Sequence, residues 1–162
     1  MSKEAKTNAM RLLDRQKIPY TVNLYECDNF IDGVHVADQL GQSYDSSFKT
    51  LVTVGKSGGH YVFVLPVDKE LDLKKAAKIV GEKSVEMVHV KDILALTGYI
   101  RGGCTPLGMK KPFPTVIHES VLRYPQVIIS GGRIGAQIML APADLLRAAS
   151  AKTADILKEE SV

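Results

Sequence analysis

Lys49 is the residue in this sequence that most strongly suggests a chemical role, because it lies in a stretch that otherwise has the pattern of a β-strand. Residues 47–54 read Ser-Phe-Lys-Thr-Leu-Val-Thr-Val. Side chains alternate between the faces of a strand, so Lys49 shares a face with Leu51 while Phe48 lies on the other. An ammonium group beside apolar neighbours costs free energy unless a counter-charge or a bound anion compensates it. A bound substrate would supply that compensation. The alternative, which this position taken alone favours, is a lysine that snorkels to water with its stem on the sheet.

Two glycine-rich segments are candidates for contact with a ligand. Residues 98–108 read Gly-Tyr-Ile-Arg-Gly-Gly-Cys-Thr-Pro-Leu-Gly and combine four glycines with a cation. Glycine permits positive φ and lets a ligand approach the backbone closely. Ser130-Gly131-Gly132 opens the second segment, whose backbone N–H groups could face a phosphate or a developing oxyanion. Tight-turn geometry is the rival explanation, and for residues 130–135 taken alone a plain hairpin is favoured.

The cysteines and histidines do not form a metal-binding pattern. Cys27 and Cys104 are the only cysteines, and the four histidines are scattered singly along the chain. Neither disulfide nor zinc spacing is present, so we expect two reduced thiols, no metal and no cofactor. Cys104 lies in the first glycine-rich segment and is therefore a rival candidate for a nucleophile. No adjacent base is identifiable in the sequence, which argues against that role.

The composition is that of an ordinary globular domain. The chain has 162 residues, of which 45% are apolar and 24% charged. This length predicts a single domain over residues 1–162, with a flexible tail after about residue 150. We find no secretory signal and no apolar stretch that could span a bilayer, which predicts a cytoplasmic protein. The net charge of +3 suits a polyanionic partner without requiring one.

The hydrophobic patterns predict alternating short helices and strands. We expect a first helix behind an N-cap at Ser2, a loop that displays Phe30, and a hairpin whose turn is residues 55–59. The further predicted helices cover residues 34–40, 73–80, 90–97 and 142–149, and the further predicted strands cover residues 20–25, 115–118, 127–130 and 136–140. Strands interrupted by short helices, rather than regular βαβ units, favour a mixed α/β sheet or a partly closed barrel.

Four segments, taken in order and with their spacing, resemble the YbaK/EbsC family of aminoacyl-tRNA deacylases. They are Lys17-Ile18-Pro19-Tyr20, Phe48-Lys49-Thr50-Leu51, residues 98–111 and Ser130-Gly131-Gly132. The resemblance covers nearly the whole chain and is nearest to the bacterial branch that clears Cys-tRNA(Pro). It implies an α/β fold with a mixed, twisted β-barrel-like sheet surrounded by helices, similar to the editing domain of bacterial prolyl-tRNA synthetase.

The resemblance also implies roles for individual residues. Lys49 matches the essential lysine of the family, which makes it the expected catalytic residue. The expected substrate-binding residues are Tyr20, Phe30, Thr50, Gly102, Gly103, Thr105, Ser130, Gly131 and Gly132, with Tyr20 and Phe30 as walls of the aminoacyl pocket. Relatives commonly carry an aliphatic residue and Ser where this chain has Cys104 and Thr105. Thr105 keeps the hydroxyl, but its added methyl group changes the width of a tight pocket and hence which aminoacyl group fits.

The resulting hypothesis is a trans-editing deacylase that removes cysteine from mischarged Cys-tRNA(Pro), with Cys-tRNA(Cys) as a further substrate. By resemblance, the thiol of the substrate attacks its own carbonyl and expels the tRNA. The enzyme is then a hydrolase overall and lyase-like through thiolactone formation. No strong protein nucleophile is required, which fits a sequence without a Gly-x-Ser-x-Gly motif.

Two alternatives stay open. One is deacylation of another small aminoacyl-tRNA such as Ala-tRNA(Pro), and the other is a non-catalytic tRNA-binding or regulatory module. The expected partner is aminoacylated tRNA, chiefly mischarged tRNA(Pro). The modest basicity predicts weak tRNA affinity and hence a ternary complex with prolyl-tRNA synthetase. We expect no association with membranes.

Overall fold

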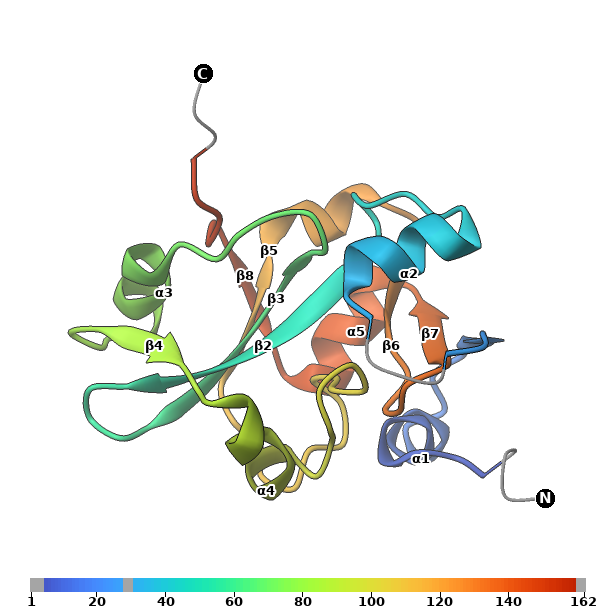
Figure 1. Ribbon diagram of the computed structural model, residues 1–162, viewed down its shortest axis with the longest axis horizontal. Coiled ribbons are helices and arrows are strands. Elements are labelled where there is room, and N and C mark those ends of the chain that lie inside the picture. Colours follow the sequence, from blue (N-terminus) through green and yellow to red (C-terminus); the bar gives the residue numbers. More distant parts are fainter. Residues whose placement is uncertain (1–4, 28–30, 160–162) are drawn as a thin grey trace.

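The computed structural model describes residues 5–27 and 31–159 and shows two sheets flanked by short helices (Figure 1). The helices are α1 (Asn8–Arg15), α2 (Gly33–Leu40), α3 (Leu73–Val80), α4 (Ile93–Thr97) and α5 (Pro142–Ala149), with 3₁₀ turns η2 (Val90–Asp92) and η3 (Glu119–Arg123). The strands are β1 (Thr21–Leu24), β2 (Phe48–Gly55), β3 (His60–Pro66), β4 (Val85–Met87), β5 (Thr115–His118), β6 (Val127–Ser130), β7 (Ala136–Leu140) and β8 (Lys152–Ala154). No helix within the described ranges is long and apolar enough to cross a membrane.

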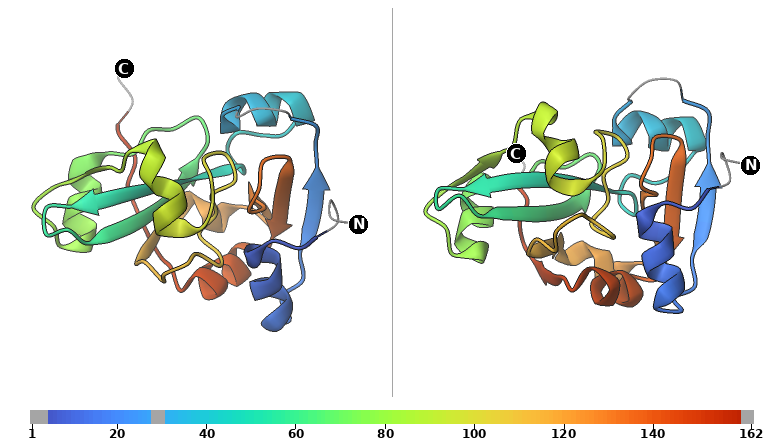
Figure 2. Two further views of the ribbon diagram at one scale, coloured as in Figure 1. Left: turned by 60° about the horizontal axis from the view of Figure 1, so that its bottom comes forward. Right: turned by 90° about the horizontal axis from the view of Figure 1, so that it is seen from below.

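The strands form a five-stranded sheet in the order β4-β2-β3-β5-β8 and a three-stranded sheet in the order β1-β7-β6. The larger sheet is mixed, since β3 and β5 pair in parallel whereas β2 and β3 are antiparallel. The two sheets lie side by side, with the β2–β3 hairpin extending away from the smaller one (Figure 2). The predicted mixed α/β fold is therefore confirmed. The described strands are barrel-like in arrangement, but they do not close into a barrel.

A single bridge joins the two sheets. Ser47, just before β2, pairs in parallel with Ile128 of β6. The backbone N–H of Ile128 donates to the carbonyl of Ser46 at 2.9 Å. The beginning of β2 is thereby held against β6, whereas β4 pairs only with the far end of the strand, from Thr53 to Gly55.

The predicted hairpin of β2 and β3 is confirmed, with a register that runs from Phe48 opposite Pro66 to Val54 opposite His60. Alternate residues of β3 enter different hydrophobic clusters, as the period of a strand requires. Val62 and Val64 pack with α1, α5 and the smaller sheet, whereas Phe63 and Leu65 pack with α3. Both faces of β3 are therefore buried.

The first helix begins later than the sequence predicted. Its N-cap is Thr7, whose hydroxyl accepts from the backbone N–H of Met10 at 3.3 Å, and not Ser2, which lies outside the described residues. The same hydroxyl donates to the carbonyl of Gly131 at 2.6 Å. This contact with Gly131, which is distant in sequence, helps to fix Thr7 as the residue at which the helix begins.

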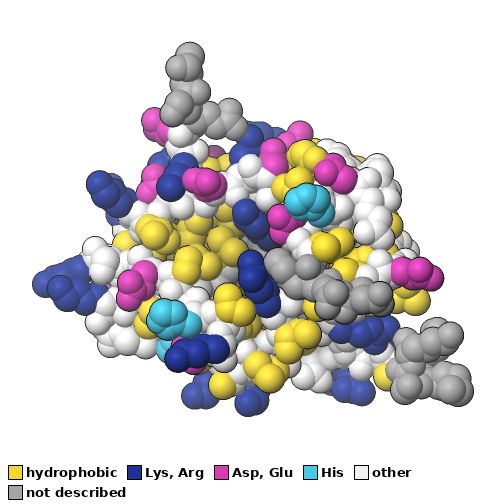
Figure 3. All heavy atoms as spheres, in the orientation of Figure 1, with side chains coloured by type: hydrophobic (Ala, Val, Ile, Leu, Met, Phe, Trp, Pro, Cys, Tyr) yellow, Lys and Arg dark blue, Asp and Glu magenta, His cyan; other side chains and the backbone are white. Residues whose placement is uncertain are grey.

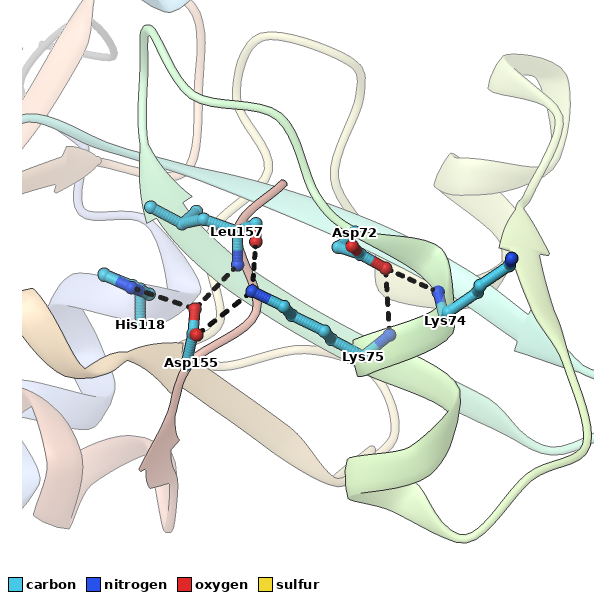
Figure 4. A network of polar contacts seen from close by, with 6 residues as sticks. All are labelled: Asp72, Lys74, Lys75, His118, Asp155 and Leu157. Carbon is cyan, nitrogen blue, oxygen red and sulfur yellow. Dashed lines mark hydrogen bonds and ion pairs between the residues drawn. The ribbon is translucent and has the colours of Figure 1, made fainter. Parts of the chain in front are cut away.

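Residues 152–157 are packed, where the sequence predicted a flexible tail after about residue 150. Strand β8 pairs in parallel with β5, and Ile156 is fully buried against α3. Asp155 accepts from Lys75 of α3 at 3.1 Å, and its other oxygen lies 3.8 Å from the His118 ring (Figure 4). The Lys75 ammonium holds the pKa of the Asp155 carboxyl below its usual value, so this anchor is charged at neutral pH.

Replacement of Ile156 tests whether this segment contributes to stability. Ile156→Ala should lower the free energy of unfolding by about 2–5 kcal/mol, because it leaves a cavity in the cluster beneath α3. Urea unfolding followed by circular dichroism measures the change. Lys158→Ala is the matched control, since that exposed side chain contacts only Glu70 among the described residues. Equal effects of the two substitutions would contradict a packed C-terminal segment.

Candidate active site

A cavity of about 280 Å³ opens where the two sheets meet. Its walls come from the beginning of β2, from β6 and β7, from α2 and the residues before it, and from the loop after α4. The lining residues are Tyr25, Ile31, Asp32, Gly33, Val36, Ser47, Phe48, Lys49, Thr50, Leu51, Val67, Arg101, Gly102, Cys104, Ile128, Ile129, Ser130, Ala136 and Gln137. Charged side chains of both signs gather where β2 approaches α2, beside a broad apolar area (Figure 3). The cavity is thus mostly apolar with a few polar groups, which is typical of small-ligand sites.

Lys49 lines this cavity and is half-buried. Burial lowers the pKa of its ammonium group, and the carboxylates of Glu70, Asp68 and Asp32 partly offset that effect. Within the described residues, no hydrogen bond or ion pair of 4 Å or less reaches the Lys49 ammonium. The cation is therefore held in a partly desolvated position without a direct counter-ion, where an anionic or strongly polar ligand would bind favourably.

Asp32 provides a carboxylate in the cavity wall. It is the N-cap of α2, and its side chain accepts from the backbone N–H of His35 at 2.9 Å. This backbone hydrogen bond is the main cause that lowers the pKa of Asp32, so the group is a carboxylate at neutral pH. The cavity accordingly carries a cation from β2 and an anion from the start of α2.

Thr50 contributes a hydroxyl without a protein partner. Its Oγ1 is buried and makes no hydrogen bond in the described part of the chain, and the Oγ1 of Thr105 is in the same condition. Buried polar groups are nearly always satisfied, so each exception needs a cause. Thr50 lines the cavity, but its Oγ1 has almost no accessible surface, so the hydroxyl itself is not open to a ligand in this structure. Thr105 is fully buried outside the lining, and nothing in the structure explains its unpaired hydroxyl.

The loop after α4 is held rigid next to the cavity. The hydroxyl of Tyr99 donates to the carbonyl of Leu107 at 2.6 Å, and burial raises the pKa of Tyr99 to about 12. Gly102 has a φ of +89°, a value that favours glycine, and it lines the cavity. A Cβ on Gly103 would lie 2.8 Å from the Cα of Arg133. Gly103 therefore lets the two glycine-rich segments contact each other.

The structure brings together only part of the predicted set. Lys49, Thr50, Gly102 and Ser130 all line the cavity. Four others lie behind its surface, namely Gly103, Thr105, Gly131 and Gly132. Gly131 approaches the backbone of Ala136, and a Cβ on Gly132 would meet the side chain of Thr7 at 2.8 Å. These glycines shape the turn that carries Ser130.

Tyr20 does not line the cavity, and Phe30 lies outside the described residues. The Tyr20 ring packs against the larger hydrophobic cluster, and its hydroxyl donates to Asp14 of α1 at 3.0 Å. Tyr20 precedes β1, whose own residues pair with β7 on the other side of the smaller sheet from β6. Among the described residues, the aromatic side chains that line the cavity are Tyr25, just beyond the end of β1, and Phe48 of β2.

Several lining residues were missed from the sequence. Gln137 could have been found from the hairpin register, because it stands opposite Ser130 in the antiparallel pair of β6 and β7. Asp32 had a local signal as a helix N-cap, but nothing local indicated that the start of α2 lies beside β2. Arg101 belongs to the glycine-rich segment, and its position in the wall depends on that loop's tertiary packing.

Cys104 lines the cavity as a protonated thiol. Burial raises its pKa to about 11, against a smaller opposing effect from Thr97. The thiolate is the nucleophilic form of cysteine, so this environment does not activate Cys104. Among the described residues, no group of His, Cys, Asp and Glu side chains could hold a metal ion.

The family model of the aminoacyl-tRNA editing domain matches residues 33–148. The chain is 46% identical to a protein of Enterococcus faecalis (strain ATCC 700802 / V583) that carries the name Cys-tRNA(Pro)/Cys-tRNA(Cys) deacylase EbsC. The match extends over 158 residues, which cover 97% of this chain and 96% of that protein. A solved structure of a trans-editing enzyme for prolyl tRNA synthetase is 29% identical, with a TM-score of 0.82 over 94% of this chain and 96% of that one. Part of the proline–tRNA ligase of Pelobacter propionicus is 34% identical over 76 residues, or 47% of this chain and 13% of the ligase.

The state of Cys104 can be tested by alkylation. In a Cys27→Ala variant at pH 8, about one Cys104 thiol in a thousand should be ionised when the pKa is about 11. Iodoacetamide should therefore label the folded protein slowly, label it faster as the pH rises, and label the urea-unfolded protein rapidly. Intact-mass spectrometry measures the rates. Similar rates for the folded and unfolded protein at pH 8 would contradict a protonated, buried thiol.

Proposed function

This chain belongs to the aminoacyl-tRNA editing family, and from that premise we propose that it is a trans-editing deacylase that removes cysteine from mischarged Cys-tRNA(Pro). The observation that carries the proposal is the half-buried Lys49 in a cavity of about 280 Å³, without a direct counter-ion among the described residues. Cys-tRNA(Cys) is a further substrate, as the name of the Enterococcus relative includes it. Such an activity belongs to translation and would place the protein in the cytoplasm.

The ammonium of Lys49 is suited to an ester whose cleavage develops negative charge. It would lie near the ester carbonyl or the terminal adenosine phosphate of the tRNA, and it would stabilise charge that forms during reaction. Its partial burial strengthens that interaction, because a cation acts over a longer range where water is excluded. Ser130 offers a hydroxyl group in the same wall, and Gly102 lets the backbone approach the ligand.

The thiol of the substrate acts as the nucleophile in the proposed reaction. Its sulfur attacks the carbonyl carbon of the same cysteinyl group, and a C–S bond forms as the ester C–O bond breaks. The terminal ribose oxygen leaves and takes up the proton that the thiol loses. Water then hydrolyses the resulting thiolactone to free cysteine, so the overall reaction is a hydrolysis. Holding the two reacting groups close supplies much of the rate, which suits a cavity whose own thiol is not activated.

Prolyl-tRNA synthetase is the proposed partner in a ternary complex with the tRNA. Two similarities support it, one to part of a proline–tRNA ligase and the other to a trans-editing enzyme for prolyl tRNA synthetase. The modest net charge of +3 agrees with weak binding of tRNA by the chain alone.

Replacement of Lys49 is the most direct test of the catalytic assignment. Lys49→Ala should lower the deacylation rate of Cys-tRNA(Pro) by at least about a hundredfold, because the developing charge loses its stabilising cation. The melting temperature should fall little, since the ammonium forms no ion pair with any residue that the structure describes. Lys56→Ala, at the remote hairpin turn, is the control and should keep full activity. Near-normal turnover by Lys49→Ala would falsify the assignment.

A panel of aminoacylated tRNAs tests the substrate and the mechanism together. Cys-tRNA(Pro) should be cleared, whereas Ser-tRNA(Pro), of similar size, should persist because a hydroxyl is a weaker nucleophile than a thiol. Faster clearance of Ala-tRNA(Pro) would favour the alternative deacylase, and salt-sensitive binding without turnover would favour a non-catalytic module. Repeating the panel with prolyl-tRNA synthetase tests the partner, and an unchanged rate counts against it.

A further inference from the structure

Gln137 is a buried polar residue in the cavity wall that the reaction described above does not use. It lies in β7, is 7% exposed, and stands opposite Ser130 in the register of β6 and β7. Directly opposed residues of an antiparallel pair project from the same face, so the Gln137 amide and the Ser130 hydroxyl are neighbours in the wall.

Gln42 holds the Gln137 amide through two reciprocal hydrogen bonds. The Nε2 of Gln42 donates to the Oε1 of Gln137 at 2.8 Å, and the Nε2 of Gln137 donates to the Oε1 of Gln42 at 3.0 Å. Gln42 follows Gly41, the left-handed C-cap of α2. The pair therefore joins the end of α2 to the middle strand of the smaller sheet, and residues of both elements line the cavity.

This pairing leaves half of the hydrogen-bonding capacity of Gln137 unused. A primary amide has two N–H donors and two acceptor lone pairs, and the Gln42 pair uses one of each. In the described part of the chain, the second N–H and the second lone pair have no protein partner. Rotation of the Gln137 amide would break both bonds with Gln42 at once, so its remaining donor and acceptor are held in fixed directions.

We propose that Gln137 is a further substrate-binding residue and that Gln42 is a positioning residue that acts through it. The inference rests on the proposed function, which defines the ligand as an aminoacyl ester. Such an ester offers an α-ammonium group for the Gln137 carbonyl oxygen, and oxygen atoms of the ester and ribose for the Gln137 N–H. An amide suits this position because it is uncharged. A carboxylate at this position would add to that of Asp32, raise the pKa of Lys49 further and compete with the substrate for its ammonium.

Binding of a stable substrate analogue tests the inference apart from turnover. The probe is adenosine that carries cysteine through an amide bond at its 3′ position, and its affinity is measured by isothermal titration calorimetry. Gln137→Ala should weaken binding roughly tenfold, the loss expected for hydrogen bonds to a charged group. Gln42→Ala should weaken binding less, and the double variant should match Gln137→Ala, because Gln42 acts only through its partner.

Two further variants separate positioning from a merely structural role. Gln42→Glu keeps an acceptor for the Nε2 of Gln137 and should restore part of the affinity that Gln42→Ala loses. Gln39→Ala is the control, since the exposed Gln39 side chain donates to the carbonyl of Glu26 and lies outside the cavity lining. Its affinity should equal that of the wild type. A structural role alone would lower the melting temperature of the Gln42 and Gln137 variants and leave their affinity at low temperature unchanged.

Three outcomes would overturn the inference. They are wild-type affinity in Gln137→Ala, a full additional loss from Gln42→Ala in the Gln137→Ala background, and no binding of the analogue by the wild type. The proposed function fails in a different way, if the wild type binds the analogue with the expected dependence on Gln137 but does not release cysteine from Cys-tRNA(Pro). The two failures are therefore distinguishable.

Discussion

The candidate active site depends on the short contact that joins the two sheets. The parallel bridge between Ser47 and Ile128 holds the beginning of β2 against β6, and every other wall of the cavity is placed relative to that seam. Beyond this point β2 pairs with β4 instead, so the cavity is confined to the end of the strand where Lys49 lies. Two sheets that closed into a barrel here would fill this space with backbone hydrogen bonds. The incomplete closure is what creates room for a ligand.

The chemistry of the cavity follows from the position of one cation in a partly dry environment. Lys49 projects from a strand whose neighbours are apolar, and three carboxylates at longer range offset only part of the cost of its burial. The fold thereby keeps the Lys49 ammonium without a direct counter-charge from the described residues when no ligand is bound, as is common at functional sites. The buried hydroxyl of Thr50 likewise has no partner in the described part of the chain.

Local patterns in the sequence predicted the elements well, and contacts between distant segments explain the differences. The β2–β3 hairpin and the helices predicted over residues 73–80 and 142–149 each depend on neighbouring residues, and each is confirmed. The cap at Thr7 and the packed C-terminal segment depend on partners far away in the chain, which no local pattern encodes. The site shows the same division. Lys49 had a signal in its own strand, whereas the placement of Tyr20 and Gln137 is set by strand order and register.

The protonated state of Cys104 has a consequence for the cavity that we propose as the site of a thiol-bearing ligand. Disulfide exchange and oxidation both begin from a thiolate, and burial keeps this sulfur in the thiol form. A cysteinyl group that enters the cavity therefore meets a second sulfur that neither attacks its carbonyl nor captures it as a mixed disulfide. The wall gains the soft, polarizable surface of sulfur and stays resistant to covalent trapping during oxidative stress.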